Sequence, residues 1–260
     1  LADYMVYLAA VGKYQVGTID QMLAAVGFHH RQQGLANPID NRPLLKLTRK
    51  GIARTQGAAP RKWPVSPKAL RWLLEQLDSL EKQASAVGQS RAAYGFLMEG
   101  AAVSLAFSFL LRKSEYVPEG GAKHAMRWMD IALRVDKDGR PGVSLWIRSS
   151  KTDQLGVGVH RVREQTGGAL CVVARVARWR VAAARLGLCK DETRAACRYA
   201  GGQPLQSKRV QVLLKHAMQQ TNEIPRQVGC VIGSHSLRVG GATALLSQGA
   251  SVSCIMLKGV

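Results

Sequence analysis

Apolar residues recur at helical spacing through the first part of the chain. They lie three and four positions apart in residues 1–10, again from Thr18 to Gly34, and a third time from Pro43 to Gln56. This period is typical of amphipathic helices, with Thr18 as an N-cap and Gly34 as a C-terminal stop. We therefore predict a compact helical domain over residues 1–57.

The pattern breaks where glycine, two prolines and positive charges follow one another, and we interpret residues 58–65 as a linker. Ser66-Pro67 then supplies an N-cap and a proline in the first helical turn, which predicts a new helix that continues through Leu77. The stretch 91–111 is rich in alanine, leucine and phenylalanine. It predicts a long helix that is largely buried.

Beyond this stretch the apolar positions alternate, which indicates strands. The predicted strands cover 126–135, 143–148 and 156–162, with a hairpin turn at 136–139. Helical spacing returns over 169–186, 207–220 and 234–247, and Ser251 can cap a last helix. The pattern predicts a mainly α fold with a small antiparallel β-sheet (α+β), and a second domain over residues 66–260.

The charge of the chain points to a polyanionic partner. Lys and Arg number 37 against 17 Asp and Glu, a formal net charge of +20, which favours nucleic acid. Basic residues that are spread along the whole chain do not favour a membrane surface. The residues expected to bind the polyanion lie on the third helix and beside the linker: Lys46, Arg49, Lys50, Arg61 and Lys62.

The five cysteines are odd in number and form no C-x-x-C pair, so neither a disulfide framework nor a cysteine zinc site is indicated. Reduced thiols in an intracellular protein are expected. The apolar run 101–111 is too short to span a membrane, and no signal peptide is visible. The first residue, Leu1, and a last helical pattern that is cut at Val260 suggest a fragment of a longer protein.

One stretch, 233–246, joins a polar cluster to a helical apolar run. With Ser234 as N-cap, His235 and Arg238 lie three apart in the first turn and share a face. Backbone N–H groups, an imidazole and a forked guanidinium together suit a phosphate. The alternative for the pair alone is that Arg238 binds a carboxylate and His235 is a half-buried structural histidine.

Further motifs stand in order along the chain: LRKSE at 111–115 with Arg112 and Glu115, SKTD at 150–153 with Lys151 between two predicted strands, and HSLR at 235–238. This order resembles the tyrosine recombinase (phage integrase) family. The segment 17–38 is also similar to the helical, SAM-like core-binding domain that precedes the family's DNA breaking-rejoining catalytic domain. The residues after the His-x-x-Arg box resemble recombinases of eukaryotic mobile elements.

The resemblance implies a site-specific recombinase or integrase that binds duplex DNA and needs no metal or cofactor. It implies that Arg112 and Arg238 clamp the scissile phosphate, while His235 assists as a hydrogen-bond donor or acid/base. Lys151 is implied as the general acid, and Glu115 as the residue that orients Arg112. Attack on a phosphodiester builds up negative charge, which preorganised cations stabilise. Each residue also has a structural alternative: Arg112 could cap a helix C-terminus, and Lys151 could be a solvated turn residue.

The family's nucleophile is a tyrosine downstream of the His-x-x-Arg box, and here all six tyrosines precede His235. We therefore expect this chain to position DNA without cutting it. The alternatives are a DNA-binding module without catalysis, a type IB topoisomerase-like enzyme and, more remotely, an RNA-binding protein. The resemblance further implies a synaptic tetramer on DNA, in the nucleus if the host is eukaryotic.

Overall fold

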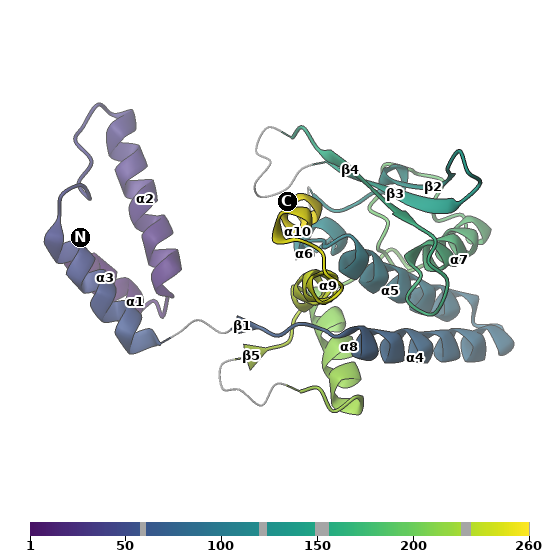
Figure 1. The fold of residues 1–260 in the computed structure, drawn as a ribbon. Helices are drawn as coiled ribbons and strands as arrows, with labels where there is room; N and C mark the ends of the chain where they lie inside the picture. Colours follow the sequence, from purple (N-terminus) through teal and green to yellow (C-terminus); the bar gives the residue numbers. More distant parts are fainter. Residues whose placement is uncertain (58–60, 120–123, 149–155, 225–229, 260) are drawn as a thin grey trace. The chain divides into compact units, whose positions relative to one another are not determined.

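The computed structural model describes residues 1–57, 61–119, 124–148, 156–224 and 230–259 (Figure 1). The chain divides into two compact units, Leu1–Arg61 and Lys62–Val260, each with its own apolar core. Within these ranges, no helix has the length and apolar character that a membrane crossing requires.

The first unit consists of α1 (Ala2–Ala10), α2 (Val16–Gln32) and α3 (Pro43–Gln56). Its core is formed by Met5, Leu8, Ile19, Leu23, Leu45 and Ile52. The predicted N-cap at Thr18 is wrong, because α2 begins two residues earlier. Gln56 supplies the cap from a distance: its Oε1 accepts the N–H of Val16 at 2.8 Å, and its Nε2 donates to the carbonyl of Tyr14 at 2.7 Å.

The second unit is built around α5 (Ser90–Ser108), which packs against α4, α7 and α9. The cap predicted at Ser66 is confirmed, since its Oγ accepts the N–H of Ala69 at 3.0 Å and α4 runs over Pro67–Ala86. Most of α5 is buried, as its composition predicts. Figure 1 shows α5 between α4 and the three-stranded sheet.

That sheet is antiparallel in the order β2-β3-β4, with β2 at Ile131–Val135, β3 at Pro141–Ile147 and β4 at Val159–Glu164. The first predicted strand is too long, because a 3₁₀ helix occupies Trp128–Asp130. A separate two-stranded sheet pairs β1 (Arg61–Lys62) with β5 (Cys230–Val231). The α+β class predicted from the sequence is confirmed.

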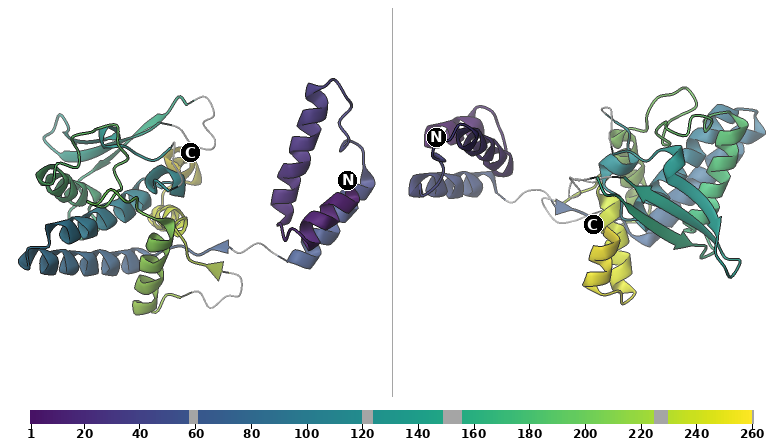
Figure 2. Two further views of the ribbon diagram at one scale, coloured as in Figure 1. Left: turned by 180° about the vertical axis from the view of Figure 1, so that it is seen from behind. Right: turned by 90° about the horizontal axis from the view of Figure 1, so that it is seen from above.

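The remaining helices are α6 (Lys113–Tyr116), α7 (Val172–Arg185), α8 (Ser207–Gln220), α9 (Ser236–Ser247) and α10 (Val252–Gly259). Figure 2 shows α9 and α10 side by side. Ser251 caps α10 as predicted, with Oγ accepting the N–H of Cys254 at 3.1 Å. Ser234 does not cap α9: its Oγ lies 3.3 Å from Ser207 Oγ, and His235 occupies the N-cap position.

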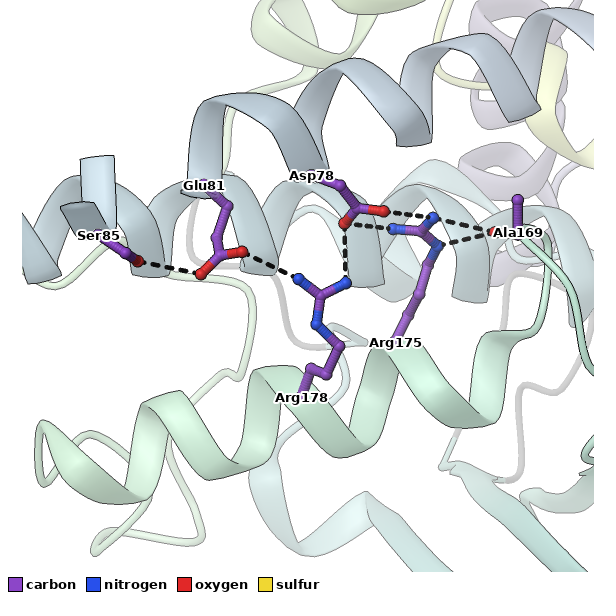
Figure 3. A network of polar contacts seen from close by, with 6 residues as sticks. All are labelled: Asp78, Glu81, Ser85, Ala169, Arg175 and Arg178. Carbon is purple, nitrogen blue, oxygen red and sulfur yellow. Dashed lines mark hydrogen bonds and ion pairs between the residues drawn. The ribbon is translucent and has the colours of Figure 1, made fainter. Parts of the chain in front are cut away.

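Ion pairs join α7 to α4 on the side of the unit shown in Figure 3. Arg175, which is 9% exposed, donates to both carboxylate oxygens of Asp78 at 3.1 Å and to the carbonyl of Ala169. Arg178 bridges Asp78 and Glu81, at 2.9 Å each. Because Arg175 is buried, its fork fixes the direction of α7, whereas the more exposed Arg178 contributes little stability.

Two consecutive glycines let α9 lie directly against the backbone of its neighbours. A Cβ added to Gly240 would stand 2.1 Å from the carbonyl oxygen of Val65, and one added to Gly241 would stand 2.2 Å from that of Phe107. Neither oxygen belongs to a flexible side chain that could move aside. The absence of side chains at these positions therefore sets the distance between α9 and the end of α5.

We predict that Gly241→Ala destabilises the second unit by about 1–3 kcal/mol, the usual cost of overpacking, because α9 must move away from Phe107. Gly100→Ala is the matched control: Gly100 lies inside α5, and an added Cβ would meet other atoms only at 3.7 Å or beyond. Helix propensity should there stabilise the unit by roughly 0.5–1 kcal/mol. Denaturant unfolding measures the change in the free energy of unfolding for both variants, and equal stabilities of the two would contradict the prediction.

Candidate functional site

The C-terminus of α5 makes a sharp reversal. The N–H of Leu111 donates to the carbonyl of Ala106 at 3.0 Å, and Leu110 adopts a left-handed conformation with φ of 55°. Glycine is the usual residue in this motif. Leucine is held there at a cost of roughly 1–2 kcal/mol, which the burial of its side chain offsets. The carbonyls at this helix end need donors from outside the helix.

Three arginines from outside α5 bind these successive carbonyls. Arg163 Nε donates to Ser108 O at 2.9 Å, Arg161 Nη1 to Phe109 O at 2.7 Å, and Arg238 Nη1 to Leu110 O at 2.7 Å. The carbonyl end of a helix carries partial negative charge, so cations are favourable here. This contact places the guanidinium of Arg238 where the chain enters α6.

Arg112 lies at the N-cap of α6 and not, as the sequence suggested, at the end of the long helix. Its N–H donates to Glu115 Oε2 at 2.7 Å, and its Nη1 donates to Glu115 Oε1 at 3.3 Å. The carboxylate is almost fully buried, while the Arg112 side chain is 22% exposed. Glu115 thus fixes both the backbone and the guanidinium of Arg112, and one side of Arg112 stays accessible to solvent.

His235 is exposed and directly precedes α9. Desolvation and the positive charges of Arg238, Lys62 and Arg112 lower its pKa below the ordinary value of 6.5. The imidazole is therefore neutral at pH 7 and can donate one hydrogen bond. The pKa of Arg238 is lowered by burial and by Arg112, and is raised by Glu115.

The turn before α9 is fixed from several directions. Tyr116 donates its hydroxyl to the carbonyl of Ser234 at 3.1 Å, and burial raises the pKa of this tyrosine. Ser236 Oγ accepts the N–H of Gly233 at 3.1 Å, and the carbonyl of Ser236 accepts the N–H of Val65 at 3.2 Å. These bonds hold His235 and Arg238 in one orientation before any ligand binds.

A cavity of about 350 Å³ opens beside His235 and Arg238. The other lining residues come from α9 and α10 and are mostly apolar: Val239, Ala242, Thr243, Leu246, Val252, Ile255 and Met256. A polar, positively charged corner therefore meets a largely apolar wall. The arrangement suits an anionic group that is attached to an aromatic or otherwise apolar ring.

The structure brings Arg112, Glu115, His235 and Arg238 together, whereas Lys151 lies outside the described residues. The strands on either side of it are paired, with Ile147 opposite Val159. Other predicted residues, Lys46, Arg49 and Lys50, are exposed on α3 of the first unit, and Arg49 pairs with Asp20 at 2.8 Å. Arg61 ends the first unit.

Lys62 belongs to the second unit, and its Nζ lies near Gly233: a Cβ added to that glycine would be 3.6 Å from it.

Arg161 is a residue that the sequence reasoning missed. Its cross-strand partner is the buried Leu145, so it occupies the inner face of the sheet, where apolar residues are the rule. The sequence does contain a hint of this role, because Arg161 and Arg163 stand at alternate positions of a strand whose inner face should be apolar.

We predict that Lys62→Ala raises the pKa of His235, because it removes one of the positive charges that disfavour the imidazolium. Arg61→Ala is the control, since it removes the adjacent exposed cation. Nuclear magnetic resonance titration of the His235 ring between pH 4 and 8 measures both variants. A His235 midpoint that stays unchanged in Lys62→Ala would place Lys62 away from the site.

No protein-family model matches the chain, and no curated protein matches it significantly in sequence. Solved structures do match. XerH site-specific recombinase bound to difH substrate, in a pre-cleavage complex, is 12% identical with a TM-score of 0.51, over 94% of this chain and 63% of that chain. Its post-cleavage complex with palindromic difH is also 12% identical, with a TM-score of 0.55, over 99% and 64%. The chain thus spans less than two thirds of the length of these structures, and its fold is similar to that of these site-specific recombinase structures.

Proposed function

We propose that this protein is a site-specific DNA recombinase or integrase that breaks and rejoins strands through a phosphotyrosine intermediate. The observation that carries the proposal is the convergence of Arg112, His235 and Arg238 at the end of α5, with Glu115 behind Arg112. The likeness of the fold to a recombinase that was solved with its DNA substrate supports it. In this proposal residues 1–57 are the core-binding domain and residues 66–260 belong to the catalytic domain.

The two arginines hold the scissile phosphate. A guanidinium donates two parallel hydrogen bonds to phosphate oxygens, and its charge does not depend on pH near neutrality. Negative charge grows on the non-bridging oxygens as the nucleophile attacks, so fixed cations stabilise the transition state more than the ground state. Neutral His235 donates a further hydrogen bond. This chemistry requires neither a metal nor a cofactor.

The nucleophile in this mechanism is a tyrosine supplied from outside the 260 residues. Its phenolate oxygen bonds to phosphorus, and the 5′-oxygen of the next nucleotide leaves with a proton from the general acid, for which we propose Lys151. The 3′-phosphotyrosine is then attacked by a 5′-hydroxyl, which releases the tyrosine and rejoins the strand. The cavity beside His235 and Arg238 has the size and apolar wall to hold the phenol ring.

The remaining cations bind the duplex along its backbone. Lys46, Arg49 and Lys50 present one exposed helix surface in the first unit, and Arg61 and Lys62 follow at its boundary with the second. Contacts of this kind position the protein on DNA and carry no sequence information. We propose duplex DNA as the partner, with self-association into a synaptic tetramer, in the nucleus for a eukaryotic host.

We predict that Arg112→Ala or Arg238→Ala lowers strand cleavage by at least about 100-fold, since each removes a preorganised donor to the transition state. The assay uses the chain extended to include a tyrosine downstream of α10. Lys113→Ala, which removes the neighbouring exposed cation, is the control and should cleave normally. Duplex affinity should change little in all three variants because many other cations remain. Normal cleavage by either arginine variant would show that this arginine does not act in the site. If the extended parent chain cleaves no DNA, the protein is a DNA-binding module without catalysis.

We further predict that Lys151→Ala cripples cleavage of ordinary DNA but cleaves DNA with sulfur at the 5′-bridging position almost normally. A thiolate leaves without a proton, whereas an alkoxide needs one. Lys137→Ala, on the turn between β2 and β3, is the matched control and should cleave both substrates. Equal loss on both substrates in Lys151→Ala would assign Lys151 to DNA binding or to hairpin structure.

A further inference from the structure

We propose that Arg161 is a positioning residue of the phosphate site. From β4 it holds the end of α5 and thereby aligns the guanidinium groups of Arg112 and Arg238. The proposal rests on the proposed function, because it concerns the same phosphate. Arg161 itself is 8% exposed and is not expected to touch DNA.

The register of the sheet explains how an arginine reaches this place. Leu145, opposite Arg161, and Val143, opposite Arg163, face the core, so both arginines on β4 project inward. Arg161 binds Phe109 O and Arg238 binds Leu110 O, which are the carbonyls of consecutive residues. Both guanidinium groups therefore bind at the same helix end, and the charge of Arg238 acts on Arg161.

Three residues of the site, Glu115, Arg238 and Arg112, act on the charge of Arg161. Burial lowers its pKa most, Arg238, Arg163 and Arg112 lower it as well, and Glu115 acts in the opposite direction, so that together they bring it to about 10. A buried cation at this position raises the electrostatic potential where the phosphate binds, and it does so with little solvent screening. It also keeps Leu110 O in the position that Arg238 needs. Removal of Arg161 should therefore weaken phosphate binding even where the fold is kept.

Arg163 is a matched control from the same strand and the same face. It also binds a carbonyl at the end of α5, and its guanidinium lies 5.1 Å from the centre of the Phe109 ring. Burial lowers its pKa, and Cys254 on α10 acts in the opposite direction. A purely structural role in holding the helix end would be shared by Arg161 and Arg163. A role in the site would belong to Arg161.

The experiment compares Arg161→Met, Arg163→Met and Arg161→Lys in the 260-residue chain. Inorganic phosphate is the probe, and its binding is followed by the ring signals of His235 in nuclear magnetic resonance spectra. Thermal unfolding and duplex affinity are measured in parallel. We expect both methionine variants to lose similar stability, but only Arg161→Met to lose about tenfold or more in phosphate affinity, because the guanidinium groups of Arg112 and Arg238 lose their alignment. Arg161→Lys restores part of that affinity because it keeps the charge.

The outcomes separate the two proposals. Failure of phosphate to shift the His235 signals of the parent chain, or binding that survives Arg112→Ala, would overturn the proposed function. Binding by the parent that is lost equally in Arg161→Met and Arg163→Met, or is lost in neither, would overturn the role of Arg161. Should Arg161→Met not fold, Arg161→Lys decides. The proposal expects Arg161→Lys to bind phosphate more weakly than Arg163→Met does, and a phosphate affinity of Arg161→Lys equal to that of Arg163→Met contradicts it.

Discussion

The arrangement of the site depends on how one helix ends. Because α5 ends at Ser108 and Leu110 reverses the chain, the carbonyls of Ser108, Phe109 and Leu110 need donors from outside the helix. A buried carbonyl without a donor is costly, so arginines from β4 and α9 are drawn to the same point. The chain that emerges from the reversal begins α6 with Arg112. The arginines that donate hydrogen bonds to the end of α5 thus also form the cationic site.

The site also requires that α9 lies close to α5, and the absence of side chains at two glycines allows this. Gly240 and Gly241 allow backbone contact with Val65 and Phe107. Any side chain at position 241 would push Arg238 away from Leu110 O, three residues along the chain from Phe107. The His-x-x-Arg motif identifies candidate functional groups, and the two glycines that follow it decide whether Arg238 reaches the end of α5.

Local patterns predicted much of this fold because local energies set those elements. The bounds of α3 and α8, the caps at Ser66 and Ser251 and the α+β class all follow from periodicity and capping rules. The sequence failed where a distant residue takes over a local role. Gln56 caps α2 from 40 residues away. Arg161 breaks the rule that inner strand positions are apolar, because its partner is a helix end that no local pattern reveals.

The positive side chains of the site are crowded together, which is unfavourable in the free protein and which an anionic ligand would relieve. Burial and the surrounding positive charges lower the pKa of Arg161, Arg238 and His235, and Glu115 opposes this effect at the two arginines. Such crowding is unfavourable in the free protein. A bound phosphate removes part of the repulsion, so phosphate binding and the stability of the α5 terminus must be coupled through linkage. The groups that in the proposed function stabilise the transition state therefore make the free site electrostatically strained. Hydrogen bonds with Glu115, Tyr116 and the carbonyls at the end of α5 hold these groups in place in the free protein.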